Sequence, residues 1–136
     1  MNKICTSIKQ SKKLIKLGVD VNTVDMTYVS MKDYGENTYH LTVGKTDVDW
    51  AKDELGNLNW NDVYEKYIPA WSLSALLELI PESIDNNTDD FSQLQLTKKS
   101  VAYYYGDGAL RRGFLRDNFI NAVFEMIVWL KENNKI

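Results

Sequence analysis

Hydrophobic residues recur at helical spacing in the most apolar run of the chain, which lies between Pro69 and Pro81. Ser72 is a suitable N-cap, because its hydroxyl can accept a hydrogen bond from a backbone N–H of the first turn. Pro81 cannot donate the N–H that would continue the helix. The pattern therefore predicts a short helix over residues 73–80. Its apolar face consists of Leu73, Leu76, Leu77 and Ile80.

The predicted central helix has two interpretations. Apolar residues at helical spacing most often form the core of a domain. Trp71 then packs against Leu76 in the arrangement of a hydrophobic staple. The alternative is that the helix forms the floor of a groove or a docking face for a partner.

A basic amphipathic helix is predicted over residues 7–17. Ser7 and Gln10 have the spacing of a capping box, and Gly18 stands where a C′ glycine is expected. The polar face carries Lys9, Lys12, Lys13 and Lys16. These lysines form either a solvated face or a contact surface for nucleic acid or acidic lipid.

The last predicted helix covers residues 118–133, with Asp117 or Asn118 as its N-cap. Apolar residues again recur at helical spacing, which is typical of a helix that packs on the core. The predicted core face consists of Phe119, Val123, Phe124, Ile127 and Leu130.

Alternation of apolar and polar residues predicts two β-hairpins. Residues 26–32 and 38–43 form the first, and residues 91–97 and 101–105 form the second. Taken with the helices, the hairpins predict an α+β fold with one mostly antiparallel sheet and three helices packed mainly on one of its faces. The length of 136 residues is that of a single globular domain.

Two segments show no regular period. Residues 82–90 are predicted to form a loop, and residues 44–67 a short strand or an irregular loop. Asp85, Asn87 and Asp89 imitate the start of a calcium loop, but the glycine and the glutamate that such a loop needs later are missing.

The charge is distributed unevenly, although the net charge is only −3. Residues 1–19 carry +5, residues 20–90 carry −11 and residues 91–136 carry +3. Two interpretations are open: solvated faces happen to cluster by the sign of their charge, or the basic ends attract the acidic middle, within one chain or between copies.

The single cysteine, Cys5, rules out an internal disulfide and favours a reducing cytoplasm. No stretch resembles a membrane span or a secretory signal, so we expect a cytoplasmic protein.

The best candidate for a nucleic-acid or anion contact follows the second hairpin. The chain has only three arginines, and all of them lie close together, after the glycines of a predicted turn at residues 106–108. Arginine binds phosphate, and tyrosine can stack on bases. The predicted patch consists of Arg111, Arg112, Arg116, Lys98, Lys99 and Tyr104. The alternative is a solvated loop, since no nucleic-acid-binding motif surrounds these residues.

Other chemistry has less support. Acidic residues near Trp50 and Trp60 could line a small catalytic or carbohydrate site, or they could belong to a connecting segment whose aromatic rings cover the core. His40 has no second histidine or suitably spaced cysteine, so no metal site is predicted. No cofactor motif is present.

Three segments together resemble a known family. They are residues 4–23, the run from Pro69 to Leu77, and residues 122–135. The combination is similar to a family of small uncharacterised proteins of gut bacteria and their phages and mobile elements. The resemblance implies a mobile-element context, in which small accessory proteins often act by binding, and it assigns no catalytic residue.

The sequence therefore favours a non-enzymatic interaction protein. Its partner is either a second copy of the chain, which gives a homodimer, or an unknown protein. Nucleic-acid binding through Arg111, Arg112 and Arg116 is the first alternative. A small enzyme that uses acids near Trp50 or Trp60 is the second.

Overall fold

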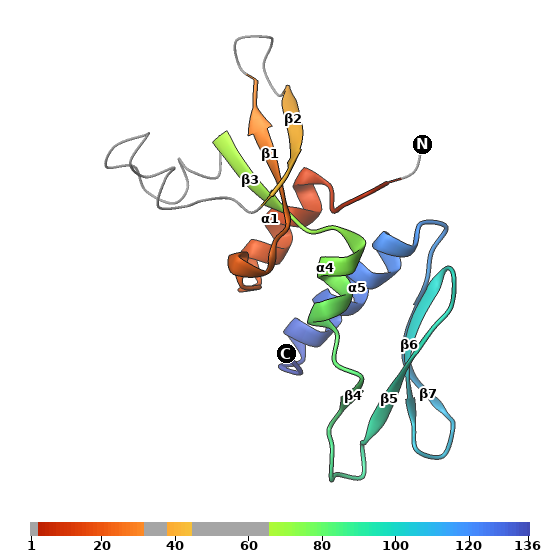
Figure 1. Ribbon diagram of the computed structural model, residues 1–136. Coiled ribbons are helices and arrows are strands. Elements are labelled where there is room, and N and C mark those ends of the chain that lie inside the picture. Colours follow the sequence, from red (N-terminus) through yellow and green to blue (C-terminus); the bar gives the residue numbers. More distant parts are fainter. Residues whose placement is uncertain (1–2, 32–37, 45–65) are drawn as a thin grey trace. The chain divides into compact units, whose positions relative to one another are not determined.

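The computed structural model describes residues 3–31, 38–44 and 66–136, which form an α+β fold with three α-helices and two antiparallel sheets (Figure 1). The predicted class, the antiparallel pairing and all three predicted helices are confirmed. The expectation of one sheet is wrong, because the two predicted hairpins lie in separate sheets of three and four strands. The chain divides into two compact units, Cys5–Ala75 and Leu76–Ile136, the latter together with Met1–Ile4.

The N-terminal unit, Cys5–Ala75, contains the three-stranded sheet, whose order is β2-β1-β3. The first predicted hairpin forms the β1–β2 pair, and β3 is an additional strand that pairs with the other side of β1. Helix α1 packs against β3. The elements are α1 (Ile8–Lys16), a short 3-10 helix (Val21–Thr23), β1 (Met26–Ser30), β2 (Tyr39–Val43) and β3 (Tyr67–Ala70).

The predicted ends of α1 are confirmed. The Ser7 hydroxyl accepts from the backbone N–H of Gln10 at 3.1 Å, and the Gln10 side chain accepts from the N–H of Ser7 at 3.0 Å. The two bonds form the capping box. Gly18 follows the helix with φ of +88°, a conformation that glycine adopts without strain.

The segment before α1 is held to the end of β3 by a buried polar network. Thr6 donates its N–H to the carbonyl of Trp71 at 2.9 Å, and its hydroxyl accepts from the N–H of Trp71 at 3.1 Å. The Thr6 hydroxyl also bonds with the hydroxyl of Ser11 at 2.8 Å. Because Thr6 and Ser11 are fully buried, these bonds satisfy polar groups that would otherwise destabilise the core.

Helix α4 (Leu73–Leu79) begins where the sequence predicts. The Ser72 hydroxyl accepts from the N–H of Ala75 at 3.2 Å, as expected for an N-cap. Asp25 adds a second support: one carboxylate oxygen accepts from the N–H of Ser72 at 2.9 Å, and the other accepts from the Ser72 hydroxyl. Trp71 is fully buried, as predicted, so the docking-face interpretation is not needed to explain it.

The C-terminal unit contains the four-stranded sheet, whose order is β4-β5-β6-β7. Helix α5 packs against β6 and β7. The ring centroids of Tyr103, in β6, and Trp129, in α5, are 6.4 Å apart. The Asn118 side chain caps α5 by accepting from the N–H of Ile120 at 2.9 Å. The elements are β4 (Ser83–Ile84), β5 (Ser92–Leu96), β6 (Ser100–Tyr105), β7 (Leu110–Leu115) and α5 (Phe119–Glu132).

Two loop predictions in the C-terminal unit need correction. The predicted loop is confirmed over residues 85–90, but Ser83 and Ile84 form strand β4, which pairs with β5. The arginines after residue 108 lie in strand β7 or directly after it, where a solvated loop was the alternative to a binding patch. Neither strand shows a clean alternation in the sequence, because β4 has two residues and β7 has an irregular register.

No helix in the described part of the chain is long and apolar enough to cross a membrane.

Candidate interaction surface on strand β7

An irregularity in the pairing of β7 determines where its side chains lie. Tyr103 pairs with Arg112, but the next residue, Tyr104, pairs with Leu110. Arg111 is therefore an extra residue, which is the definition of a β-bulge. The bulge lets Arg111 and Arg112 share the face that packs on α5, whereas strict alternation would separate them.

The same bulge places two leucines on the opposite face of the sheet. Leu110 pairs with Tyr104 and Leu115 pairs with Ser100, two β6 residues that share a face. The leucines are five positions apart and would lie on different faces of a regular strand. They are 58% and 67% exposed. This face of β7, formed by Leu110, Gly113 and Leu115 and called here the leucine face, is an apolar surface.

Gly113 lies between the two leucines and pairs with Ala102 of β6. A Cβ atom at this position would lie 3.1 Å from the Ala102 Cβ and 3.3 Å from Cδ1 of Leu110. The absent side chain therefore lets Leu110 lie close to the centre of the strand. A larger residue would have to displace either β6 or Leu110.

Arg111 is occupied by contacts within its own unit. Its guanidinium forms an ion pair with Asp85 at 2.7 Å and donates to the carbonyl of Asp90 at 2.8 Å. It also lies over the rings of Tyr105 and Trp129, 5.5 and 5.7 Å from their centroids. With a side chain only 12% exposed, Arg111 is poorly placed for the phosphate contact that the sequence suggested.

Asp85 is the centre of this ion-pair network. Its second carboxylate oxygen accepts from Nζ of Lys135 at 2.9 Å. The hydrogen bond from Lys135, followed by the one from Arg111, holds the pKa of the Asp85 carboxyl below its usual range. Asp85 has a positive φ of 53°, a conformation that aspartate tolerates better than most residues.

The other two arginines flank an aromatic ring on the α5 side of β7. The guanidinium carbons of Arg112 and Arg116 lie 4.8 and 5.8 Å from the centroid of Phe114. Arg116 also pairs with Glu125 at 2.6 Å, and its N–H donates to the carbonyl of Lys99 at 2.9 Å. The structure therefore brings Arg116 and Lys99 to the same end of the sheet.

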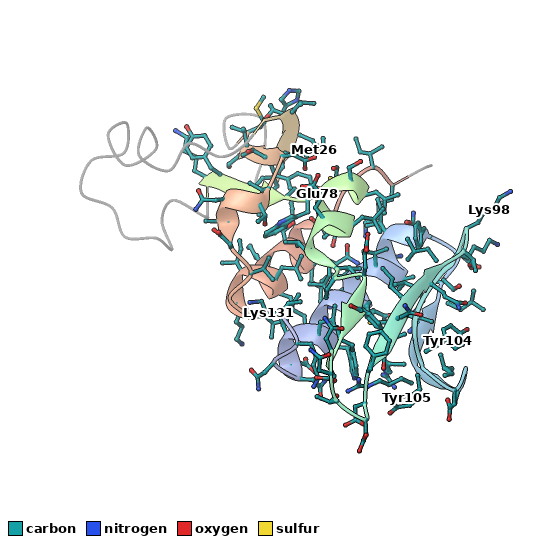
Figure 2. All side chains as sticks on the ribbon, turned by 60° about the horizontal axis from the view of Figure 1, so that its bottom comes forward. Met26, Glu78, Lys98, Tyr104, Tyr105 and Lys131 are labelled. Atoms are coloured by element: carbon teal, nitrogen blue, oxygen red, sulfur yellow. The ribbon has the colours of Figure 1, made fainter. Side chains whose placement is uncertain are left out.

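The remaining members of the predicted patch are spread along the sheet. Lys98 is exposed in the turn between β5 and β6, whereas Tyr104 lies towards the other end of β6 (Figure 2). Tyr104 is four positions from Ser100, the first residue of β6, which corresponds to about 13 Å along the strand. Residues Lys98, Lys99 and Arg116 thus lie at one end, and Arg111 and Tyr104 lie at the other.

In the part of the chain that the structure describes, neither His40 nor Cys5 contacts a side chain of the kind that catalysis needs. His40 is exposed in β2, opposite Val29. Cys5 is buried, with its sulfur 3.4 Å from the hydroxyl of Tyr28. Burial, and then this contact with Cys5, raises the pKa of the Tyr28 hydroxyl. The acids near Trp50 and Trp60 lie outside the described residues.

Within residues 3–31, 38–44 and 66–136, no group of three or more histidine, cysteine, aspartate or glutamate side chains is arranged to hold a metal ion.

The fold and the leucine face define an α+β protein with an exposed apolar face on an edge strand. Comparison of the chain with protein families, curated proteins and solved structures finds no match. The family resemblance of the three sequence segments therefore stays a prediction.

Proposed function

We propose that this chain is a non-enzymatic interaction protein that self-associates through strand β7. The observation that carries the proposal is the leucine face, where a bulge brings two exposed leucines to one side of an edge strand. Leucines at such a position are exposed apolar surface that a partner can bury.

The two edges of the four-stranded sheet differ in a way that supports this role. Strand β4, at one edge, has only two residues, and a very short edge strand offers little backbone for pairing with another chain. Strand β7, at the other edge, has six residues and no proline. Its outer backbone groups can therefore pair with an added strand.

The sequence of β7 is complementary to itself in the antiparallel direction. With a two-fold axis through Gly113, Arg112 of one copy lies opposite Phe114 of the other. Because Arg111 is the extra residue, Leu115 then lies opposite Leu110 of the second copy. Each Leu–Leu pair buries apolar surface, and each Arg–Phe pair repeats a contact that β7 already makes within one chain.

Replacing both leucines by serine (L110S/L115S) is expected to convert a dimer to a monomer. Two leucines leave the interface of each copy, and burial of one leucine stabilises by about 1.5–3 kcal/mol when complete. Partial burial of four side chains leads us to expect a dissociation constant raised about 100-fold or more, since about 1.4 kcal/mol corresponds to a factor of ten. Light scattering across a range of protein concentrations measures the change in mass.

Leu96→Ser is the matched control, because Leu96 is 46% exposed but lies on β5 and not on the edge strand. This variant should keep the wild-type mass. A wild-type chain that is monomeric at every concentration would contradict the proposal, as would an L110S/L115S variant that remains dimeric.

A further inference from the structure

Helix α1 carries an uninterrupted row of lysines. Its members are Lys9, Lys12, Lys13 and Lys16, and all four are exposed. Their spacing of three, one and three residues places them on one side of an α-helix, over a length of about 10 Å. The buried residues of the helix, Ser11 and Leu14, face away from this row. We call these four residues the lysine row.

Among residues 3–31, 38–44 and 66–136, no acidic side chain balances the positive charge of the lysine row. No acidic residue occurs within Ile8–Lys16, and none of the four lysines forms an ion pair with any residue that the structure describes. The two acids that follow in the sequence are engaged elsewhere. Asp20 accepts from the backbone and side-chain nitrogens of Asn22, at 2.9 and 3.0 Å, and Asp25 accepts from Ser72.

Helix stability does not account for the row. Lys13 and Lys16 lie in the last turn, where a positive charge favours the helix dipole. Lys9, however, lies in the first turn, where a cation is unfavourable by the same effect. Like charges three and four positions apart also repel, each pair by about 0.2–0.5 kcal/mol. A polyanionic partner would remove both penalties.

The surroundings of α1 identify the kind of partner. The apolar side of the helix packs against β3, and Leu14 is fully buried, so this side is not available to enter a membrane interface as in membrane-bound amphipathic helices. The exposed side carries no aromatic residue that could stack on an unpaired base. What remains is a line of ammonium groups, which suits a regular line of phosphates.

We propose that the lysine row binds the phosphate backbone of duplex nucleic acid without sequence preference. Duplex DNA carries one charge for about every 1.7 Å of its axis, so a row of about 10 Å can reach several phosphates at once. This surface belongs to the N-terminal unit, and the proposal does not depend on self-association through β7.

The test measures binding of the full chain to a short mixed-sequence DNA duplex by fluorescence anisotropy, as a function of salt. With four phosphate contacts, the logarithm of the binding constant should fall against the logarithm of salt concentration with a slope of about −3.6. The affinity should therefore fall about 100-fold between about 50 and 200 mM salt. K9Q/K12Q should reduce the slope to about −1.8, and replacement of all four lysines by glutamine should abolish binding.

The matched control is K98Q/K99Q, which removes two exposed lysines from the turn between β5 and β6. It should bind like the wild type. Glutamine and lysine have similar helix propensities, so thermal melts of all variants should match or exceed that of the wild type. The proposal is overturned if the duplex does not bind at low salt, or if K98Q/K99Q weakens binding more than K9Q/K12Q. Binding to vesicles that contain anionic phospholipid, without binding to the duplex, would also overturn it and would identify a lipid surface as the partner.

Discussion

Trp71→Ala is expected to lower the free energy of unfolding of the N-terminal unit by about 3–5 kcal/mol, the range for truncation of a large core aromatic residue. Trp71 is the largest fully buried side chain among the residues that the structure describes. Its indole N–H donates to the hydroxyl of Thr23 at 2.8 Å. Its backbone N–H donates to the Thr6 hydroxyl, and its carbonyl accepts from the Thr6 N–H. The substitution removes the ring from the point where three segments of the unit meet.

Urea denaturation followed by circular dichroism measures this loss without relying on the fluorescence of the replaced tryptophan. Trp71→Phe is the informative control, because it keeps a buried aromatic ring but removes the hydrogen bond to Thr23 and part of the ring volume. The hydrogen bond contributes about 0.5–1.5 kcal/mol and a smaller cavity is left, so this variant should lose less stability than Trp71→Ala. Equal stability of Trp71→Ala and the wild type would show that the ring does not carry the packing assigned to it.

The helices could be predicted from the sequence because their ends are encoded locally. Ser7 with Gln10, Ser72 and Asn118 each form the cap bond that their side chains permit. The support that Asp25 gives to Ser72 could not be predicted, because the two residues are 47 positions apart. A cap within a few residues is visible in a sequence, whereas a distant partner depends on the tertiary fold.

The strands were harder to predict because pairing determines several of them. Strand β3 has four residues and includes Pro69, which an edge strand tolerates but which weakens any strand pattern. Strand β4 has two residues and exists through its pairing with β5. In β7 the bulge at Arg111 breaks the period of two, so alternation could not reveal it.

The candidate site differs from the predicted patch for the same reason. In the sequence the three arginines form one group, but their contacts separate them. Arg111 pairs with Asp85 and Arg116 pairs with Glu125, whereas Arg112 lies over Phe114. Ion-pair partners 26 and 9 positions away are not visible from the composition of the segment. The leucine face was missed because it depends on the bulge.

Arg111→Ala is expected to lower the free energy of unfolding of the C-terminal unit by about 2–3 kcal/mol. Removal of one partner of a fully buried ion pair costs about 3–5 kcal/mol. The smaller value is expected here, because the side chains of Arg111 and Asp85 are 12% and 21% exposed and water screens part of the interaction. The substitution also removes the hydrogen bonds that the guanidinium donates to the Ser92 hydroxyl and the Asp90 carbonyl, although the Ser92 hydroxyl still donates to that carbonyl. Urea denaturation at neutral pH measures the difference.

Arg116→Ala provides the matched control for this loss. Its ion pair with Glu125 joins side chains that are 46% and 36% exposed, and exposed pairs contribute about 0–1 kcal/mol. If Arg111→Ala costs no more than Arg116→Ala, the network around Asp85 contributes no more to the stability of the unit than an exposed ion pair does.

Acid provides an independent test of the same network. The folded-state pKa of the Asp85 carboxyl is lowered by Lys135 and Arg111, so the carboxylate stabilises the fold at pH values above the ordinary carboxyl pKa. This contribution is lost as the pH falls through the lowered pKa, where Asp85 becomes protonated in the folded chain. The difference in stability between the wild type and Arg111→Ala should therefore shrink as the pH is lowered from neutral to about 3. That final pH lies below the ordinary aspartate pKa of about 3.9. In an Asp85→Asn background the corresponding difference should be smaller at neutral pH and nearly independent of pH over this range. A difference that stays constant in the wild-type background would mean that Arg111 stabilises the unit through its contacts with Tyr105 and Trp129, and not through the charge of Asp85.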